Sequence, residues 1–101
     1  MEILNKKVII RADRAGVFFG TLVRKENTPS GVECEINDCR RLWYWDGAAS
    51  LSQMAMDGVK EPWKCKFSVV VPQIIVMGVI EIIPCTEDAI QSIERVAVWK
   101  R

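Results

Sequence analysis

The sequence predicts a single, mainly β domain with two short helices, an α+β fold that covers residues 1–101. Several short segments are rich in β-branched and aromatic side chains and are bounded by Gly, Pro, Asn or Asp, as strands are. Two other segments place apolar residues at helical spacing behind a Ser or Thr that can cap a helix. A chain of 101 residues suits one domain with a modest core.

The first three strands are predicted in the N-terminal third of the chain. Residues 7–11 and 17–24 are rich in Val, Ile and Phe, and Gly16 lies in the turn between them. Residues 27–31 contain Asn, Thr, Pro, Ser and Gly and form the clearest turn in the sequence. Residues 32–36 alternate apolar and acidic side chains, which predicts a half-buried strand with both glutamates outward.

A short helix is predicted for residues 50–58. Ser50 suits the N-cap position, and Gly58 can end the helix. Its buried stripe is formed by Leu51, Met54 and Ala55. A second short helix is predicted to begin at Thr86, with Glu87 and Asp88 at its positive end. The apolar residues that it buries are Ala89, Ile90 and Ile93.

The remaining strands are predicted in the C-terminal half. Residues 67–71 form a strand that Pro72 stops. Residues 74–77 and 79–83 are near-continuous apolar runs, which predicts two buried, central strands. Residues 96–99 are predicted to close the sheet.

Composition excludes several classes of function. The sequence contains no histidine, which removes the commonest general base, the Ser-His triads and most catalytic zinc sites. We therefore expect no metal, no cofactor and no catalysis. The net charge of +1 gives no basic excess that would point to nucleic acid. Four cysteines without C-x-x-C spacing, in a sequence with no secretory signal and no membrane span, predict free thiols in a reducing cytosol.

The segment at residues 40–53 is the most unusual part of the sequence. Two arginines precede three consecutive aromatic residues, and a helix start rich in Ser and Gln follows. Tryptophan stacks on flat rings, and arginine pairs with phosphate, so these are the parts of a nucleotide pocket. If residues 38–45 are extended, Arg41, Trp43 and Trp45 share one face. The predicted ligand-binding residues are Arg40, Arg41, Trp43, Trp45, Ser50, Ser52 and Gln53. The alternative is that the tryptophans belong to the core and the arginines to its solvated rim.

One carboxylate interrupts an apolar run. Glu81 must face a polar cavity, an arginine, the sheet edge or solvent. The pairs Glu33 with Glu35 and Glu87 with Asp88 are interpreted as solubilising and helix-terminal charges rather than catalytic groups.

Two fragments resemble the Sm-like barrel family. Residues 20–22, followed by residues 32–38, resemble the first half of its pattern, and residues 75–80 resemble the second half. The resemblance implies a small, strongly bent SH3-like or Sm-like barrel that can form rings. Residues 40–66 then form a helical insertion, and none of that family's RNA-binding residues is carried over.

Nearly the whole chain resembles a family of short bacteriophage-encoded proteins that form a domain of unknown function. Residues 6–11, 15–22, 41–53 and 79–86 carry the resemblance, and the block from Trp43 to Gln53 is its specific part. The resemblance implies a viral accessory protein that acts inside a bacterium, in the host cytoplasm.

Taken together, these features predict an anti-defence protein that binds and sequesters a nucleotide-derived immune signalling molecule without catalysis. We expect a homo-oligomer, because the chain has more apolar sequence than one small domain can bury. Two alternatives stay open. One is an Sm-like or SH3-like adaptor for a host protein or nucleic acid. The other is a small metal-independent phosphodiesterase or lyase that uses Glu81, Tyr44 or the arginines.

Overall fold

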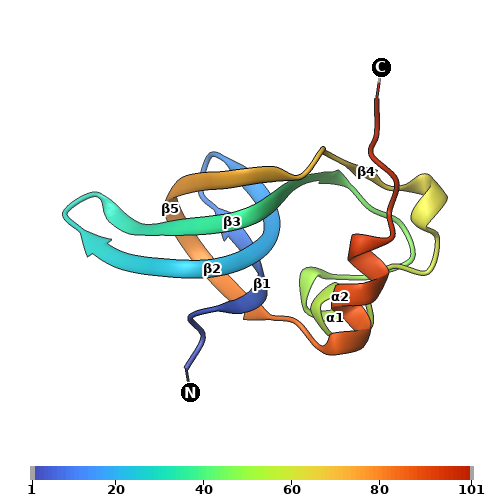
Figure 1. Cartoon of the computed structure of the whole chain (residues 1–101), viewed down its shortest axis with the longest axis horizontal. Helices are drawn as coiled ribbons and strands as arrows, with labels where there is room; N and C mark the ends of the chain where they lie inside the picture. The colour runs from blue at the N-terminus through green and yellow to red at the C-terminus, as the bar shows by residue number, and fades with distance from the viewer. Residues whose placement is uncertain (1, 101) are drawn as a thin grey trace.

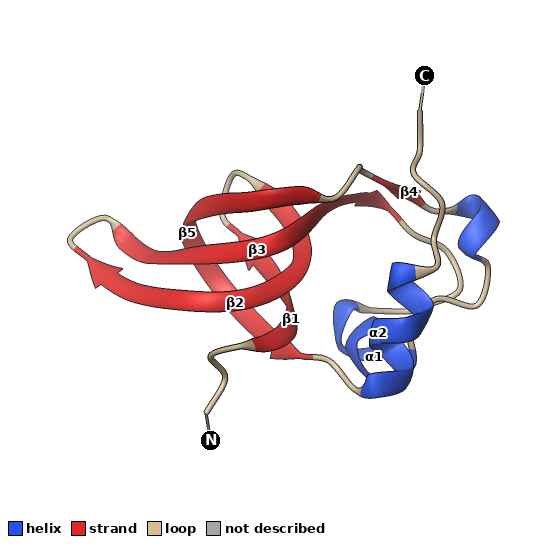
Figure 2. Ribbon diagram, viewed as in Figure 1, coloured by secondary structure: helices blue, strands red, loops and turns tan. Residues whose placement is uncertain are grey.

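Four long antiparallel strands close into a ring, and two short helices lie outside it (Figure 1). The computed structural model describes residues 2–100. Its elements are β1 (Lys6–Ala12), β2 (Gly16–Thr28), β3 (Gly31–Tyr44), α1 (Leu51–Asp57), the 3₁₀ helix η1 (Pro62–Lys64), β4 (Lys66–Phe67), β5 (Val71–Pro84) and α2 (Glu87–Glu94). The predicted mainly β fold with two helices is confirmed, and the helices form a group at one side of the strands (Figure 2).

The ring arises because each of the four long strands pairs with two others of the four, and β3 pairs with β4 as well. The sheet order is β2-β1-β5-β3-β4, and β2 also pairs with β3. In β2, Gly16 to Leu22 face β1, whereas the later part of the strand pairs only with β3 as far as Thr28. In β5, the first half pairs with β3, and the half from Val79 to Pro84 pairs with β1. Strands that change partner along their length must bend, which closes the barrel.

Two glycines permit the bends. A Cβ atom at Gly20 would lie 2.5 Å from Cγ2 of Ile36 and 2.9 Å from the carbonyl oxygen of Asn37, so β2 and β3 approach closely there. Gly78 has φ +72°, a left-handed conformation that a glycine adopts without steric cost. It lies where β5 changes partner, and its carbonyl accepts a hydrogen bond from Asp13 N–H at 2.9 Å.

The wall of the barrel separates two apolar cores. The barrel interior is filled by Val8, Ile10, Ala12, Phe18, Leu22, Cys34, Ile36, Cys39, Val76 and Val79. The second core lies between the outer wall and the helices and contains Ile9, Phe19, Leu42, Met54, Ala55, Val59, Cys65, Phe67, Ile93 and Val96. Successive side chains of a strand point to opposite faces, so Phe18 and Phe19 enter different cores. The first three strands are therefore buried on both sides where the helices cover them.

Both predicted helices and their caps are confirmed. Ser50 caps α1 by accepting a hydrogen bond from the Gln53 N–H, and Gly58 follows its last residue. Thr86 caps α2 by accepting a hydrogen bond from Ala89 N–H. The alternation predicted for residues 32–36 is also present, because Cys34 and Ile36 are fully buried.

The C-terminal strands differ from the prediction. Residues 74–77 and 79–83 form one strand, β5, and it is not buried on both faces: Ile75, Met77 and Ile80 are exposed. A strand in a barrel wall buries only its inner face unless another layer covers the outer one. Residues 96–99 form no strand. They make one parallel bridge, between Phe67 and Val98.

The strand predicted for residues 67–71 was also wrong. Its extent is only Lys66–Phe67, and Pro72 lies inside β5 instead of ending the earlier strand.

None of the helices among residues 2–100 combines the length and the apolar character needed to span a membrane.

Candidate functional site

The seven residues predicted to form one site are distributed over four places. Arg40 lies beneath α2, and Arg41 points toward the turn after β1. Trp43 and Trp45 border a hollow at the end of β3. The remaining three, Ser50, Ser52 and Gln53, belong to the start of α1.

The face shared by Arg41, Trp43 and Trp45 was predicted wrongly. The pairing of β3 with β4 shifts register between Leu42 and Tyr44, which marks a bulge or irregularity. Such a shift breaks the alternation of side chains along the strand. As a result Trp43 and Tyr44 are both exposed, and Trp45 packs against the second core.

Arg40 is buried, with a relative exposure of 3%. Its Nε donates a hydrogen bond to the carbonyl of Ser68 at 2.9 Å, and its Nη1 donates one to the carbonyl of Ile93 at 3.1 Å. The guanidinium also lies over the ring of Phe67, 5.4 Å from its centroid. Because Ile93 is in the last turn of α2, Arg40 adds a donor to a carbonyl at the negative end of that helix, which also accepts a hydrogen bond from the N–H of Val96 at 3.2 Å. Burial lowers the pKa of Arg40 from its ordinary value, although a guanidinium stays charged at neutral pH.

The third nitrogen of Arg40 has no partner. Nη2 is buried and makes no hydrogen bond, and it is the one such side-chain atom found among residues 2–100. None of the ion pairs within that part of the chain includes Arg40. A buried cationic donor without an acceptor is costly. A bound anion at this atom would supply the acceptor that it lacks.

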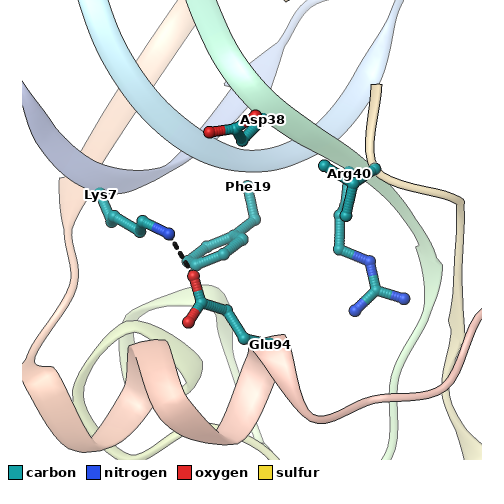
Figure 3. A pocket seen from close by; sticks show the side chains of 6 residues that line it. Lys7, Phe19, Asp38, Arg40 and Glu94 are labelled. Atoms are coloured by element: carbon teal, nitrogen blue, oxygen red, sulfur yellow. Dashed lines mark hydrogen bonds and ion pairs between the residues drawn. The ribbon is translucent and has the colours of Figure 1, made fainter. Parts of the chain in front are cut away.

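Arg40 lines a pocket of about 290 Å³ on the outer wall of the barrel. The other lining residues are Lys7, Phe19, Asp38, Val70 and Glu94, which come from β1, β2, β3, the segment before β5, and α2. In Figure 3 the Lys7–Glu94 ion pair and the Arg40 side chain lie on either side of the Phe19 ring. Asp38 and Val70 are exposed, so the pocket opens to solvent.

Sequence reasoning missed these five residues. Asp38 carries the clearest local sign, because its φ of +50° is rare for a residue other than glycine. It lies opposite the shift in register between β2 and β3, next to Gly20. Irregular pairing of this kind is common beside functional sites.

Arg41 is held on a different part of the surface. Its Nη1 donates a hydrogen bond to the carbonyl of Ala15 at 3.0 Å, and the guanidinium lies 4.7 Å from the centroid of the Phe18 ring. Arg41 is partly exposed and does not line the pocket of Arg40. The two adjacent arginines therefore do not line one pocket.

An aromatic surface lies at the end of β3. The rings of Trp43 and Trp99 meet edge to face with their centroids 5.6 Å apart. Lys66 Nζ lies 5.2 Å from the Trp99 ring and 5.9 Å from the Tyr44 ring. Trp43, Tyr44 and Trp45 border a hollow of about 260 Å³. We call the side chains of Trp43, Tyr44, Lys66 and Trp99 the aromatic surface.

The polar residues at the start of α1 cap the helix. The Ser50 hydroxyl accepts a hydrogen bond from the N–H of Gln53 at 3.1 Å, and the Gln53 side chain accepts one from the N–H of Ala49 at 2.8 Å. This reciprocal arrangement satisfies helix donors locally. The side-chain oxygens of Ser50 and Gln53 are therefore occupied as acceptors, whereas Ser52 is exposed on α1.

Glu81 faces an arginine. Its Oε1 accepts a hydrogen bond from Arg11 Nε at 3.1 Å across the β1–β5 pair, and both side chains are largely exposed. It is thus outside the pocket of Arg40. Within residues 2–100, no group of three His, Cys, Asp or Glu side chains is placed to hold a metal ion.

The four cysteines lie within the described residues and are free. Burial raises the pKa of each thiol, and for Cys39 and Cys85 it does so to about 12. A thiol with a raised pKa forms little thiolate at neutral pH and is a poor nucleophile.

Comparison with known proteins gives one match. A family model described as Domain of unknown function (DUF6948) matches residues 5–93. No curated protein and no solved structure matches the chain significantly. The resemblance to a family of unknown function is thereby confirmed, and the phage origin attached to it stays a prediction.

Proposed function

This chain belongs to the family described as Domain of unknown function (DUF6948), and from that premise we propose that it binds and sequesters a small nucleotide-derived anion without catalysis. The cellular setting in the proposal is that of a phage accessory protein which acts against host defence in the bacterial cytoplasm. The observation that carries the proposal is the unpartnered Nη2 of Arg40 at the pocket between the barrel and α2.

The chemistry of the pocket supports an anion of small size. Arg40 offers a donor with no acceptor, and Lys7 offers a second cation at the same pocket. Arginine is well suited to phosphate because its planar donors match phosphate oxygens. A volume of about 290 Å³ is near the lower end of small-molecule sites, which begin at roughly 300 Å³.

Absence of catalysis rests on the sequence. The chain has no histidine, and the acidic residues at the pocket are Glu94, which is paired with Lys7, and the exposed Asp38. A protein that only binds its ligand needs no catalytic group, and Lys7 and Arg40 at the pocket are hydrogen-bond donors for an anion.

The test is equilibrium binding to a panel of cyclic nucleotides and ADP-ribose derivatives. We expect one class to bind and to be recovered intact after the protein is denatured by heat. Arg40→Lys keeps the charge but loses the planar set of donors, so it should weaken binding about tenfold. Arg41→Lys is the matched control, because Arg41 lies outside the pocket, and its affinity should equal that of the wild type.

Two results would contradict the proposal. One is that no member of the panel binds to a correctly folded wild-type protein. The other is recovery of a chemically altered ligand, which would favour a phosphodiesterase or lyase.

The proposal includes self-association through the aromatic surface. Trp43 and Tyr44 are exposed at 53% and 50%, and the Trp99 ring is partly exposed beside them. Exposed aromatic groups that form a contiguous patch are typical of protein interfaces. A second copy of the chain is the partner that we expect there.

A further inference from the structure

The ion pair between Lys7 and Glu94 borders the pocket that contains Arg40. Their side chains are 33% and 43% exposed, so water reaches both charged groups. An exposed ion pair contributes little to stability, because solvent screens it and two long side chains must be held in place. Another anion can therefore replace the Glu94 carboxylate at small cost.

The position of Glu94 makes that replacement easier. It is the last residue of α2, and a negative charge at the C-terminal end of a helix is disfavoured by the helix dipole. Arg40, bound to the carbonyl of the preceding Ile93, stabilises this end of the helix. Moving the Glu94 side chain away would relieve an unfavourable charge without breaking that hydrogen bond.

A ligand that binds Arg40 also needs a movement at the pocket. Nη2 is covered in the free protein, so a ligand reaches it only after a neighbouring side chain moves. Glu94 directly follows the residue whose carbonyl Arg40 binds. It also ends at the pocket, in contact with Lys7 (Figure 3).

Resting on the proposed function, we propose that the terminal phosphate of a nucleotide-derived ligand displaces the Glu94 carboxylate and binds Lys7 Nζ and Arg40 Nη2 together. The Glu94 side chain then turns outward to solvent. In the free protein its carboxylate is an internal substitute for that phosphate.

The charges select the class of phosphate. Once Glu94 has moved, the inner part of the pocket presents two cations, Lys7 and Arg40. A phosphate monoester carries a charge of about −1.5 to −2 at neutral pH. A cyclic diester carries a single charge. The pocket is therefore matched to a terminal phosphate rather than to a cyclic one.

The experiment is titration calorimetry of the full chain with 5′-AMP and with adenosine 3′,5′-cyclic monophosphate. We expect Glu94→Gln to bind 5′-AMP about fivefold more tightly than the wild type, because no carboxylate competes for Lys7. Glu81→Gln is the matched control. It makes the same change in net charge and also breaks an exposed ion pair, with Arg11, but outside the pocket. Its affinity should be unchanged.

A second variant tests the cation directly. Lys7→Met should lose most of the preference for 5′-AMP over the cyclic nucleotide. This result does not depend on Glu94→Gln being stable, and the melting temperature of each variant without ligand shows that it is folded.

The outcomes separate the two proposals. If the wild type binds 5′-AMP and Glu94→Gln binds it no more tightly, the displacement of Glu94 is wrong and the proposed function stands. The same conclusion follows if the protein binds only ligands without a terminal phosphate. If no nucleotide binds to the wild type or to either variant, both proposals fail.

Discussion

Arg40 has two separable roles at the scale of single residues. Two of its nitrogens bind backbone carbonyls of Ser68 and Ile93, and these contacts connect β3 to the segment after β4 and to α2. Its third nitrogen is free. The first role is structural and the second is available for a ligand, so removal of the whole side chain tests mainly the first.

We expect Arg40→Ala to lower the free energy of unfolding by about 2–4 kcal/mol. The change leaves the carbonyl of Ser68 without its Arg40 donor, removes one of the donors to the carbonyl of Ile93, and opens a cavity beneath α2. Arg41→Ala should cost less than about 1 kcal/mol, because that side chain is partly exposed and donates one hydrogen bond, of 3.0 Å, to the carbonyl of Ala15. Urea unfolding of both variants provides the comparison. Equal losses would show that burial of Arg40 contributes nothing to stability.

Alkaline pH should destabilise the protein through its buried thiols. Burial raises the pKa of Cys39 and Cys85 to about 12, whereas an unfolded thiol has a value of 9.0. Above pH 9 the unfolded chain therefore loses protons that the folded chain retains. The stability from these groups is full below pH 9 and is lost as pH rises toward 12.

Cys85→Ala should remove part of that dependence. The melting temperature of the wild type falls more steeply between pH 9 and 11 than that of the variant, since other groups titrate alike in both. Parallel curves for the two proteins would indicate that Cys85 ionises in the folded state as readily as in the unfolded chain.

The two helices were predictable from the sequence because the residues that begin and end each helix lie close together in the chain. The caps at Ser50 and Thr86 and the end at Gly58 involve residues within one or two turns of each other. The lengths of β2, β3 and β5 were underestimated. Those strands continue because they find a second partner in the ring, and nothing in a short window of sequence reports that pairing.

The candidate site was predicted only in part for the same reason. Arg40 was identified, but its neighbours at the pocket, Lys7 and Glu94, lie far from it in the sequence, in β1 and α2. One signal was present. Phe18 and Phe19 are adjacent large apolar residues in a strand, which requires both faces of β2 to be covered. A layer over the outer face follows from that requirement.

Gly20→Ala tests the closure of the barrel. The added Cβ would lie 2.5 Å from Cγ2 of Ile36 and 2.9 Å from the carbonyl oxygen of Asn37, closer than real contacts allow. We expect a loss of about 1–3 kcal/mol in the free energy of unfolding, because β2 and β3 must separate locally. Chemical denaturation measures it. A variant as stable as the wild type would mean that these strands have room to shift.

At the scale of the whole molecule, many large apolar side chains lie outside both cores and are exposed. Large exposed side chains outside the aromatic surface include Trp63, Val69, Val70, Ile75, Met77 and Ile80. A small domain cannot cover all of them, and association is the usual consequence.

In the homo-oligomer that we propose, Trp43→Ser should shift the equilibrium toward monomer without unfolding the protein, since the Trp43 ring is 53% exposed. Trp63→Ser is the control. That tryptophan is even more exposed, at 74%, and is not part of the aromatic surface, so its loss should leave association unchanged. Sedimentation velocity at micromolar concentration measures the oligomeric state of the two variants and of the wild type. A wild-type protein that sediments as an 11.5 kDa monomer would remove the premise.

The pocket joins the two ends of the chain, because Lys7 and Glu94 are 87 positions apart. Ribosomes add about 5–20 residues per second, so roughly ten seconds pass between the synthesis of these two residues. During that time the nascent chain contains the pocket residue from β1 but lacks the one from α2. Messenger RNA that is cut before the codons for α2 yields protein without the helix that carries Ile93 and Glu94, so it cannot complete the pocket. Under the proposed function, only chains that include α2 would bind the ligand, and the onset of binding in a cell would lag behind the onset of translation.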